Sequence, residues 1–355
     1  MKALRYYASK DVRLENVPEP EPGADEVKIK IKWCGICGSD IHEYEQGPIS
    51  IPTKKPHPGT GKMAPLIIGH EFSGDIVKTG SNVKSFKPGD RVAVRPTLPC
   101  YRCYYCKQGK HIQCVVLGLL GGSADGGFAE YVAVPADNVY KLPAQVSYEA
   151  AAYAEPIAVG VHAVKRSQMI IGDTVAIIGA GPIGLLTMQA ARAGGAGKAI
   201  VFEILPQRAK LARELGATAV INPKEKDPGK AIAELTDGKR ADIAFECVGS
   251  GEALVLADTV SGRGSKIIQV GALISPVNFS FFNLFWREKS IITSQGYVDE
   301  YSAAIAFLAD GRIKCDPLMT TAKIRLEDTI EKGFKELVGP NRADHCKILV
   351  SPDMS

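Results

Sequence analysis

The chain has 355 residues, 45% of them hydrophobic and 23% charged, and its formal net charge is +4 at pH 7. It is longer than the ~250–300 residues at which single cores stop growing, so we expect two domains. Its basic and acidic residues are scattered, which argues against a nucleic acid or a membrane surface as partner. No apolar run approaches the ~20 residues of a membrane span. The N-terminus also lacks the apolar run of a secretory signal, so we expect a cytoplasmic protein.

The first part of the chain, up to about residue 155, has the pattern of short β-strands. Alternating or branched runs are separated by Gly and Pro turns, which predicts a β-rich domain. The expected strands include residues 26–33, 72–80, 90–96 and 128–135. A stretch rich in Pro and Gly at 47–65 predicts a long surface loop.

Between residues 156 and 290 expected strands alternate with expected helices, which is typical of a parallel sheet with helices on both faces. Strands are expected at 174–180, 198–203, 218–222, 242–249 and 265–272, and helices at 182–195 and 205–217. The last part of the chain ends in an expected strand at 345–351 and should rejoin the first domain. We therefore assign residues 1–155 and 291–355 to one domain and 156–290 to the other, in an α/β fold.

Four of the nine cysteines are clustered: Cys100, Cys103, Cys106 and Cys114. They are candidates for disulfides, an iron–sulfur centre, a structural zinc or a catalytic zinc. Nine cysteines cannot all pair within the chain, and structural disulfides are rare in the cytosol. Four thiolates complete a tetrahedral zinc shell and leave no position for a substrate, which favours a structural zinc. The aromatic and basic residues between them are weak support for nucleic-acid binding on a nearly neutral chain.

The remaining cysteines outside the motifs are expected to be buried free thiols. They are Cys34, Cys247, Cys315 and Cys346.

A glycine motif follows the expected strand at 174–180 and opens the next helix. Gly179, Gly181 and Gly184 have the G-x-G-x-x-G spacing of dinucleotide-binding folds, in which the helix N-terminus stabilises the phosphate charge. Glu203 ends the following strand, where a carboxylate binds the adenosine ribose and repels a 2′-phosphate. The motif therefore predicts NAD as the cofactor, with Arg208 near its adenosine end. The predicted dinucleotide contacts are Gly179, Gly181, Pro182, Ile183, Gly184, Glu203, Arg208, Cys247, Val248, Val270 and Gly271.

Two further residues, Cys37 and His70, are of types that bind zinc, although either alone could be a core residue. Their surroundings carry a resemblance. The motifs are CGICGSDIH at 34–42, GHEFSG at 69–74, KPGDRV at 87–92, the cysteine spacing C-x2-C-x2-C-x7-C, GGFAEYV at 126–132, Glu155–Pro156 and GAGPIG at 179–184.

With these motifs the chain resembles, over essentially its full length, the zinc-dependent medium-chain alcohol and polyol dehydrogenases. The stretch from His42 to His70, with its Pro-rich insertion, is most similar to the 2,3-butanediol (acetoin) dehydrogenase branch. Sorbitol and related polyol dehydrogenases are the nearest alternative. The resemblance implies a GroES-like β-rich catalytic domain and a Rossmann domain.

The resemblance also implies two zinc ions per chain. The catalytic zinc would be held by Cys37, His70 and Glu155, and the structural zinc by the cysteine cluster. Glu71 is a further carboxylate that replaces or exchanges with the third ligand in some relatives, so the choice between Glu155 and Glu71 stays open. Asp40 is expected to orient His70, as partners of metal-bound histidines commonly do.

The implied reaction oxidises a secondary alcohol. A three-ligand zinc keeps a position open for the alcohol oxygen and lowers its pKa, and hydride then passes to the nicotinamide. Ser39 and His42 match the relay that carries the hydroxyl proton to solvent. We expect a vicinal diol as substrate and a homodimer or homotetramer. A polyol substrate, or a non-catalytic zinc- and dinucleotide-binding protein, are the alternatives.

Overall fold

In the computed structural model, which describes residues 1–354, the chain forms two compact units. The first comprises residues 1–155 and the chain from Cys315 onward, and the second spans Pro156–Lys314. The second boundary lies later than the expected 290/291. The reason is that β16 (Ser290–Thr293) pairs in parallel with β15 (Ser261–Gln269), so the segment after 290 completes the sheet of the second unit.

The first unit is built from β-sheets. Its largest sheet has the order β10-β6-β5-β3-β18-β17, with β9 also paired to β3, and smaller sheets have the orders β2-β1-β4 and β7-β8. The strands are β1 (Lys2–Ala8), β2 (Asp11–Asn16), β3 (Glu26–Gly35), β4 (Leu66–Ile67), β5 (Glu71–Thr79), β6 (Arg91–Val94), β7 (Thr97–Leu98), β8 (Gly118–Leu119), β9 (Tyr131–Pro135), β10 (Val139–Lys141), β17 (Thr320–Arg325) and β18 (Lys347–Ser351). The helices are α1 (Gly38–Gln46), α2 (Tyr104–Lys107), α3 (Tyr148–Ala151) and α11 (Lys335–Val338).

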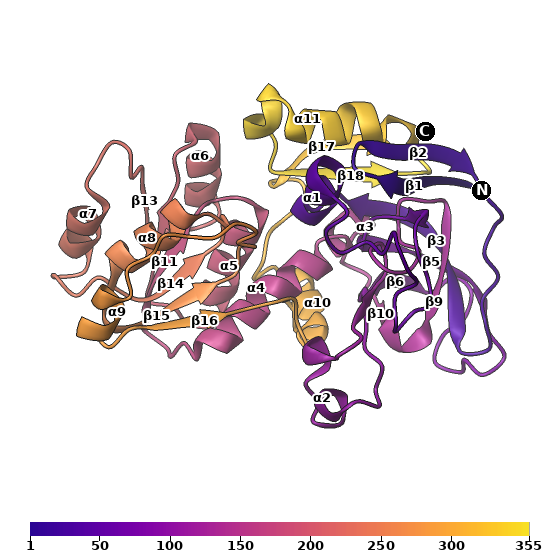
Figure 1. Cartoon of the computed structure of the whole chain (residues 1–355), viewed down its shortest axis with the longest axis horizontal. Coiled ribbons are helices and arrows are strands. Elements are labelled where there is room, and N and C mark those ends of the chain that lie inside the picture. The colour runs from indigo at the N-terminus through magenta and orange to yellow at the C-terminus, as the bar shows by residue number, and fades with distance from the viewer. Residues whose placement is uncertain (355) are drawn as a thin grey trace. The chain divides into compact units, whose positions relative to one another are not determined.

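The end of the chain returns to this unit, as expected. Strand β18 pairs antiparallel with β3, and β17 pairs in parallel with β18, so the yellow C-terminal strands lie among the indigo N-terminal ones in Figure 1.

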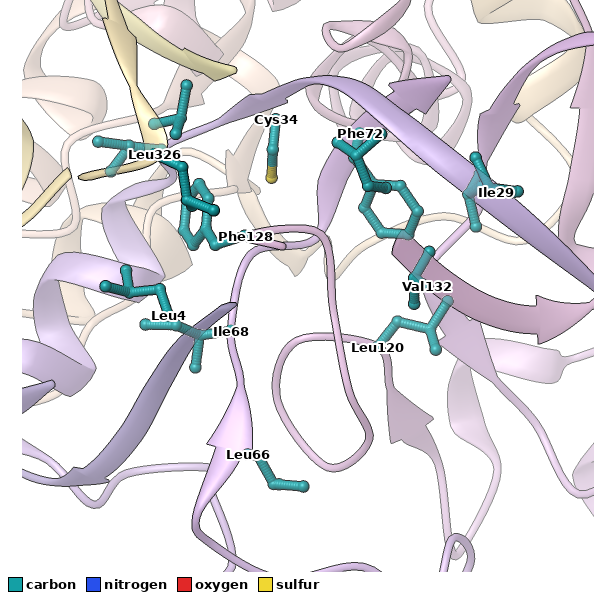
Figure 2. Packing of buried hydrophobic residues seen from close by; sticks show 14 of the residues in the cluster. Leu4, Ile29, Cys34, Leu66, Ile68, Phe72, Leu120, Phe128, Val132 and Leu326 are labelled. Atoms are coloured by element: carbon teal, nitrogen blue, oxygen red, sulfur yellow. The ribbon is translucent and has the colours of Figure 1, made fainter. Parts of the chain in front are cut away.

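Alternation along β3 explains the core of the first unit. Val27, Ile29 and Ile31 are fully buried, because successive side chains of a strand point to opposite faces. Figure 2 shows Ile29 in the same apolar cluster as Phe72 and Phe128. This packed core fixes the ends of the strands from which the candidate site is built.

The second unit has a six-stranded parallel sheet with the order β13-β12-β11-β14-β15-β16. The remaining strands are β11 (Thr174–Ile178), β12 (Lys198–Phe202), β13 (Ala219–Ile221) and β14 (Ala241–Glu246). The helices are α5 (Pro182–Ala193), α6 (Pro206–Glu214), α7 (Pro228–Leu235), α8 (Gly251–Val260), α9 (Phe282–Trp286) and α10 (Tyr301–Ala309), while α4 (Ala154–Ser167) begins at the boundary of the units. Numbered along the chain, this is the 3-2-1-4-5-6 order of a doubly wound sheet, whose ligand crevice lies outside the carboxyl ends of β11 and β14. No helix in the described part of the chain is long and apolar enough to cross a bilayer.

Candidate metal and dinucleotide sites

Three residues that can bind a metal meet in the first unit. One ligand atom each from Cys37, His70 and Glu71 lies within 4.8 Å of the other two. His70 and Glu71 are buried, and Cys37 is partly exposed. Thiolate, imidazole and carboxylate are the three ligand types that zinc accepts in proteins, so the chemistry of this donor set fits a zinc ion.

Strand pairing brings these residues together. Glu71, the first residue of β5, lies opposite Gly35, the last residue of β3. Cys37 follows β3 and caps the N-terminus of α1, and His70 precedes β5 directly. The cluster therefore depends on the register of β3 and β5.

Gly69 explains why a glycine precedes His70. Its φ is +91°, and an added Cβ would lie 2.7 Å from the ring of Phe128 and 2.9 Å from Sγ of Cys34. Only glycine fits this left-handed, crowded position without displacing the core. Cys34 itself is a buried core thiol rather than part of the metal cluster, and burial raises the pKa of its thiol.

Asp40 connects two members of the cluster. Its Oδ2 accepts a hydrogen bond from the backbone N–H of Cys37 at 2.9 Å, and its Oδ1 lies 3.6 Å from Nδ1 of His70. Because Nδ1 faces Asp40, Nε2 is the nitrogen available to a metal. Burial opposes protonation of His70, but the charges of Asp40 and Cys37 outweigh it and raise the pKa of His70 well above its ordinary value. A dication beside Nε2 would displace that proton.

Lys347 was not singled out by the sequence. It is 3% exposed, and its Nζ donates to both carboxylate oxygens of Glu71, at 2.8 and 2.7 Å, and to the carbonyl of Ile36 at 3.1 Å. Burial opposes its charge, but Glu71 and Cys37 outweigh burial and raise the pKa of Lys347 above the ordinary lysine value. The available signal was a lysine at the head of the apolar run ILV, since a buried lysine requires a partner.

Glu155 lies in the first turn of α4 and is 8% exposed. Its charge contributes to the raised pKa of Lys347, which places it near the same cluster. It is not within the 4.8 Å set formed by Cys37, His70 and Glu71. The structure thus brings Glu71 closer to the two predicted ligands than Glu155.

Ser39 and His42 lie on α1, directly after Cys37. They are three residues apart, so they project from the same face of the helix. Ser39 is exposed and His42 partly exposed, which leaves both accessible to solvent.

The four clustered cysteines also come together. Their sulfur atoms lie within 4.8 Å of one another, around the short helix α2. The backbone N–H of Cys100 donates to Sγ of Cys114 at 3.3 Å, and that of Cys103 to Sγ of Cys100 at 3.4 Å. All nine cysteines of the chain are free of disulfides. Four sulfurs at this spacing, with backbone N–H groups directed at them, fit a structural zinc.

Backbone hydrogen bonds and burial shift the pKa values of two of these thiols in opposite directions. Backbone N–H groups of Cys106 and Val115 lower the pKa of Cys103 to about 6, whereas burial and the neighbouring thiols raise that of Cys106 to about 12. The Cys103 thiolate therefore forms easily, and its negative charge opposes ionisation of the neighbouring thiols. A dication held by all four would offset that repulsion.

In the second unit, the predicted glycine turn links β11 to α5. Gly179 has a φ of +89°, and an added Cβ would lie 2.5 Å from the side chain of Val248. At Gly184 it would lie 1.9 Å from the carbonyl oxygen of Gly179. At Gly181 the nearest atom is a guanidinium nitrogen of Arg208, 4.0 Å away. Packing requires glycine at positions 179 and 184, whereas Gly181 leaves the backbone open to a ligand.

Pro182 is the first residue of α5, and Ile183 follows it. Both are partly exposed, so the N-terminus of this helix is accessible to a phosphate.

Glu203 follows β12 and is 7% exposed. Its Oε2 accepts from the backbone N–H of Ala180 at 2.7 Å, and its Oε1 accepts from Ile204 and Leu205 at 2.7 and 2.8 Å. The predicted ribose-binding carboxylate therefore also holds the glycine turn in place. The 4.0 Å approach of Arg208 to the Cβ position at Gly181 puts its cation beside the turn itself.

The other predicted contacts follow β14 and β15, at the same edge of the sheet. Cys247 donates its backbone N–H to the carbonyl of Ile178 at 3.1 Å, which ties this loop to β11. Val248 is 55% exposed, while Val270 and Gly271 are partly exposed. Of the four cysteines expected to be buried, Cys34 and Cys315 are buried, but Cys247 and Cys346 are partly exposed because they lie in loops at strand ends.

A cavity of about 880 Å³ in the first unit is lined by residues such as Arg5, Thr60, Lys62, Asp125 and Cys100. Neither Cys37 nor His70 lines it. It therefore does not belong to the predicted catalytic cluster.

Comparison with known proteins gives two matching families. Residues 23–144 match the alcohol dehydrogenase GroES-like domain, and residues 182–310 match the zinc-binding dehydrogenase family. The first matched segment lies within the β-rich unit and includes the cysteine lobe, and the second lies within the parallel-sheet unit, from the start of α5 onward.

Whole-length relatives agree with these matches. The chain is 41% identical to (R,R)-butanediol dehydrogenase of Bacillus subtilis, over 99% of this chain and all of the relative. It is 36% identical to sorbitol dehydrogenase of the same organism, over 99% of this chain and 98% of the relative. The crystal structure of 2R,3R-butanediol dehydrogenase from Bacillus subtilis superposes with a TM-score of 0.92 at 39% identity, covering 99% of both chains.

Proposed function

The chain belongs to the family of zinc-binding alcohol dehydrogenases with a GroES-like domain, and from that premise we propose that it oxidises a vicinal diol reversibly with NAD. It is an enzyme, a diol or alcohol dehydrogenase acting on a small molecule. The proposed reaction is the interconversion of 2,3-butanediol and acetoin. The observation that carries it is the cluster of Cys37, His70 and Glu71 within 4.8 Å, in a chain that matches a butanediol dehydrogenase over its full length.

We assign the catalytic zinc to Cys37, His70 and Glu155. Glu71 is nearer the first two, but both of its oxygens accept hydrogen bonds from Lys347. Using Glu71 as the third ligand would disturb a buried ion pair, and breaking such a pair is strongly destabilising. Glu71 then remains close enough to exchange with Glu155 or to accept a hydrogen bond from the substrate.

The second zinc is assigned to Cys100, Cys103, Cys106 and Cys114. Four thiolates leave no open position, so this ion would contribute to folding rather than to the reaction. The support is the geometry of the four sulfurs and the N–H groups directed at them.

Different groups remove the proton and the hydride from the substrate alcohol. A zinc ion in the first site supplies the Lewis acidity that lowers the pKa of the substrate hydroxyl. Ser39 accepts the hydroxyl proton, and His42, one helical turn further along the same face of α1, passes it to solvent. A nicotinamide cofactor held at the glycine turn would accept the hydride.

Glu203 supports the choice of NAD. A carboxylate at the end of β12 pairs with the hydroxyls of the adenosine ribose and repels the extra phosphate of NADP. Arg208 does not reverse this preference in our proposal, because its guanidinium is directed to the turn at Gly181, where a pyrophosphate would bind.

The vicinal diol is supported by the second carboxylate. If a zinc ion held one substrate oxygen, the neighbouring hydroxyl could donate a hydrogen bond to Glu71 or Glu155, both of which are buried. Substrates that lack the second hydroxyl cannot make this hydrogen bond and should react less well. We propose the R-configured carbinol, as in the butanediol dehydrogenase relatives. A sorbitol- or xylitol-type polyol is the second candidate, because sorbitol dehydrogenases match at 36% identity.

The test is kcat/KM for (R,R)-butanediol, meso-butanediol, 2-butanol and sorbitol, measured side by side through NADH formation. (R,R)-Butanediol should give the highest value and 2-butanol a lower one, and ethanol, measured in the same assay, should be poorer still. A higher value for sorbitol would move the enzyme to the polyol branch. Equal values for 2-butanol and butanediol would remove the role given to the second hydroxyl.

We also propose that the enzyme is a homo-oligomer, a dimer or tetramer, in the cytoplasm. An aromatic patch supports the self-association: Ile274, Phe281, Phe282, Phe285 and Trp286 are each more than half exposed. Monomers seldom expose large contiguous apolar areas. The patch precedes β16, which ends the sheet in the described residues and so offers an unpaired strand edge to a second copy.

A further inference from the structure

We propose that Glu246 is a positioning residue of the dinucleotide site, and that its buried charge makes the site prefer the oxidised cofactor over the reduced one. The proposal rests on the dinucleotide chemistry proposed above and adds to it a residue that determines the redox preference. Glu246 is the last residue of β14 and has no exposed surface.

The carboxylate of Glu246 is saturated with hydrogen-bond donors. Its Oε1 accepts from the backbone N–H groups of Val248 and Gly249 at 2.7 and 2.9 Å, and its Oε2 accepts from Gly249 at 3.1 Å. The side-chain Nε2 of Gln269 also donates to Oε2. Every recorded partner is a donor, which is the pattern of an ionised, acceptor-only carboxylate.

The same residue holds a second loop through its backbone. Its carbonyl accepts from the N–H groups of Val270 and Gly271, both at 2.9 Å. Gln269, which donates to the carboxylate, also donates to the carbonyl of Gly271 at 2.8 Å. Glu246 thus fixes the loops after β14 and β15 to each other.

These loops adjoin the phosphate-binding turn. Glu246 is in register with Ile178, the residue before Gly179. The side chain of Val248 lies 2.5 Å from the Cβ position at Gly179. A displacement of the loop after β14 would therefore reach the turn directly.

The topology assigns this region to one half of the cofactor. In a doubly wound sheet the dinucleotide crosses the carboxyl ends of the strands at the switch point, here between β11 and β14. Glu203, on the β12 side, binds the adenosine ribose. The nicotinamide half then lies on the side of β14 and β15, where Glu246 is.

Glu246 carries its charge without a basic partner. No ion pair within residues 1–354 includes it. A buried anion without a nearby cation exerts a strong field, because the interior screens charge poorly. The nicotinamide ring is a cation when oxidised and neutral when reduced, whereas the pyrophosphate charge is the same in both forms. The field of Glu246 therefore favours NAD+ over NADH.

The experiment measures dissociation constants of the zinc-loaded enzyme for NAD+ by calorimetry and for NADH by fluorescence. Glu246→Gln keeps the size of the side chain and removes the charge. The Kd of the Glu246→Gln variant should rise about tenfold for NAD+ and about threefold for NADH. The larger rise is expected for NAD+ because this cofactor also loses the attraction between its cationic ring and the carboxylate. Glu246→Asp keeps the charge but shortens the reach, so both Kd values should rise by the same factor. Glu252→Gln, an exposed glutamate in the first turn of α8, is the matched control and should change neither.

The ratio of the Kd for NAD+ to the Kd for NADH shows whether the charge of Glu246 sets the redox preference. A purely structural role would weaken both cofactors equally in Glu246→Gln, and that result would overturn the redox preference. Unchanged Kd values would overturn the positioning role as well. If Glu246→Gln fails to fold, Gln269→Leu and Glu246→Asp test the positioning role: both should weaken the two cofactors equally, and unchanged affinity in both would refute it. Glu246→Ala then takes the place of Glu246→Gln in the test of the charge, and an equal loss of affinity for NAD+ and NADH would overturn the redox preference.

Failure of the proposed function gives a different result. Wild-type enzyme that binds NADP+ better than NAD+ would contradict the cofactor assignment, and the same ratio would then be measured with NADP+ and NADPH. A different alcohol as best substrate would leave the Kd ratio unchanged.

Discussion

At the scale of single residues, the buried pair of Lys347 and Glu71 determines how readily Glu71 could serve as a metal ligand. Lys347 donates two short hydrogen bonds to the carboxylate of Glu71, so a metal would have to compete with Lys347 for those oxygens. In our proposal Glu155 is therefore the third ligand, and the negative charge of the metal site would come from Cys37 and Glu155. The proposal rests on the ion pair and not on proximity to Cys37 and His70, which favours Glu71.

Replacing Lys347 tests whether this lysine keeps Glu71 from binding the metal. Lys347→Met keeps the length of the side chain but leaves Glu71 as a buried, unpaired carboxylate, so the free energy of unfolding should fall by about 3–5 kcal/mol. Because the pKa of Lys347 is raised, the stabilisation is fully present below the ordinary lysine pKa of ~10.5 and is lost only as the pH rises through the folded-state value. The difference from wild type in chemical denaturation should therefore stay constant between about pH 6 and 9.

The same variant should lower kcat, because Glu71 is then free to take the position of Glu155 at the metal. Lys323→Met, at an exposed lysine on neighbouring β17, is the matched control and should cost less than about 1 kcal/mol. A Lys347→Met enzyme as stable and as active as wild type would contradict the role given to the ion pair.

Cofactor choice is also decided at this scale. Glu203→Ser should narrow the preference for NAD+ over NADP+, since the repulsion of the 2′-phosphate is removed. It should also raise KM for NAD+, because the hydrogen bond from Ala180 to Glu203 is lost and the glycine turn loosens. The measurement is kcat/KM with each cofactor. A wild-type enzyme that uses both equally would contradict the assignment.

Residue identity could be inferred from sequence only where a short motif surrounds it. Cys37 and His70 were selected because CGICGSD and GHE are local patterns, and the structure brings both side chains together. Lys347 has no such motif, and it is 276 residues from Glu71, so only the folded strands reveal their contact. Glu246 lies in an apolar run, and no sequence pattern indicates the hydrogen bonds that its carboxylate accepts.

At the scale of elements, the cysteine lobe and the catalytic cluster should respond differently to loss of a ligand. Cys103→Ser should remove one zinc and lower the melting temperature, because metal binding at a closed site is folding free energy. Cys37→Ser should remove the other zinc and the activity while the fold persists. Elemental analysis, thermal melting and turnover distinguish the two. Fully active enzyme with a single zinc, or with iron, would show the assignment of the two sites to be wrong.

Elements with strong periodicity were predicted closely. The expected strand at 174–180, helix at 182–195 and strand at 198–203 correspond to β11 (Thr174–Ile178), α5 (Pro182–Ala193) and β12 (Lys198–Phe202). The pattern is clear there because a fully buried parallel strand and an amphipathic helix alternate. Strands β1 and β2 were not among the expected strands, since their polar residues obscure the alternation.

At the scale of the whole molecule, the chain crosses between the two units twice, and the second crossing lies at 314/315, later than the expected 290/291. Strand β16 is short and carries little periodicity of its own. Its membership in the parallel sheet is decided by pairing with β15, a tertiary contact. The expected GroES-like and Rossmann architecture itself is confirmed by the family matches and by the butanediol dehydrogenase structure.

The aromatic patch leads to the last prediction, which concerns assembly. Phe285 and Trp286 are 77% and 66% exposed and precede β16, which ends the parallel sheet within residues 1–354, so burying them against a second copy would remove a large apolar area from water. The double variant Phe285→Glu with Trp286→Glu should therefore reduce the mass in solution, measured by light scattering after gel filtration, to a smaller species. Ile171→Glu, at an 87% exposed residue outside the patch, should leave the mass unchanged. If the double variant keeps the wild-type mass, or if the wild type is already a monomer, this face is not an interface between subunits.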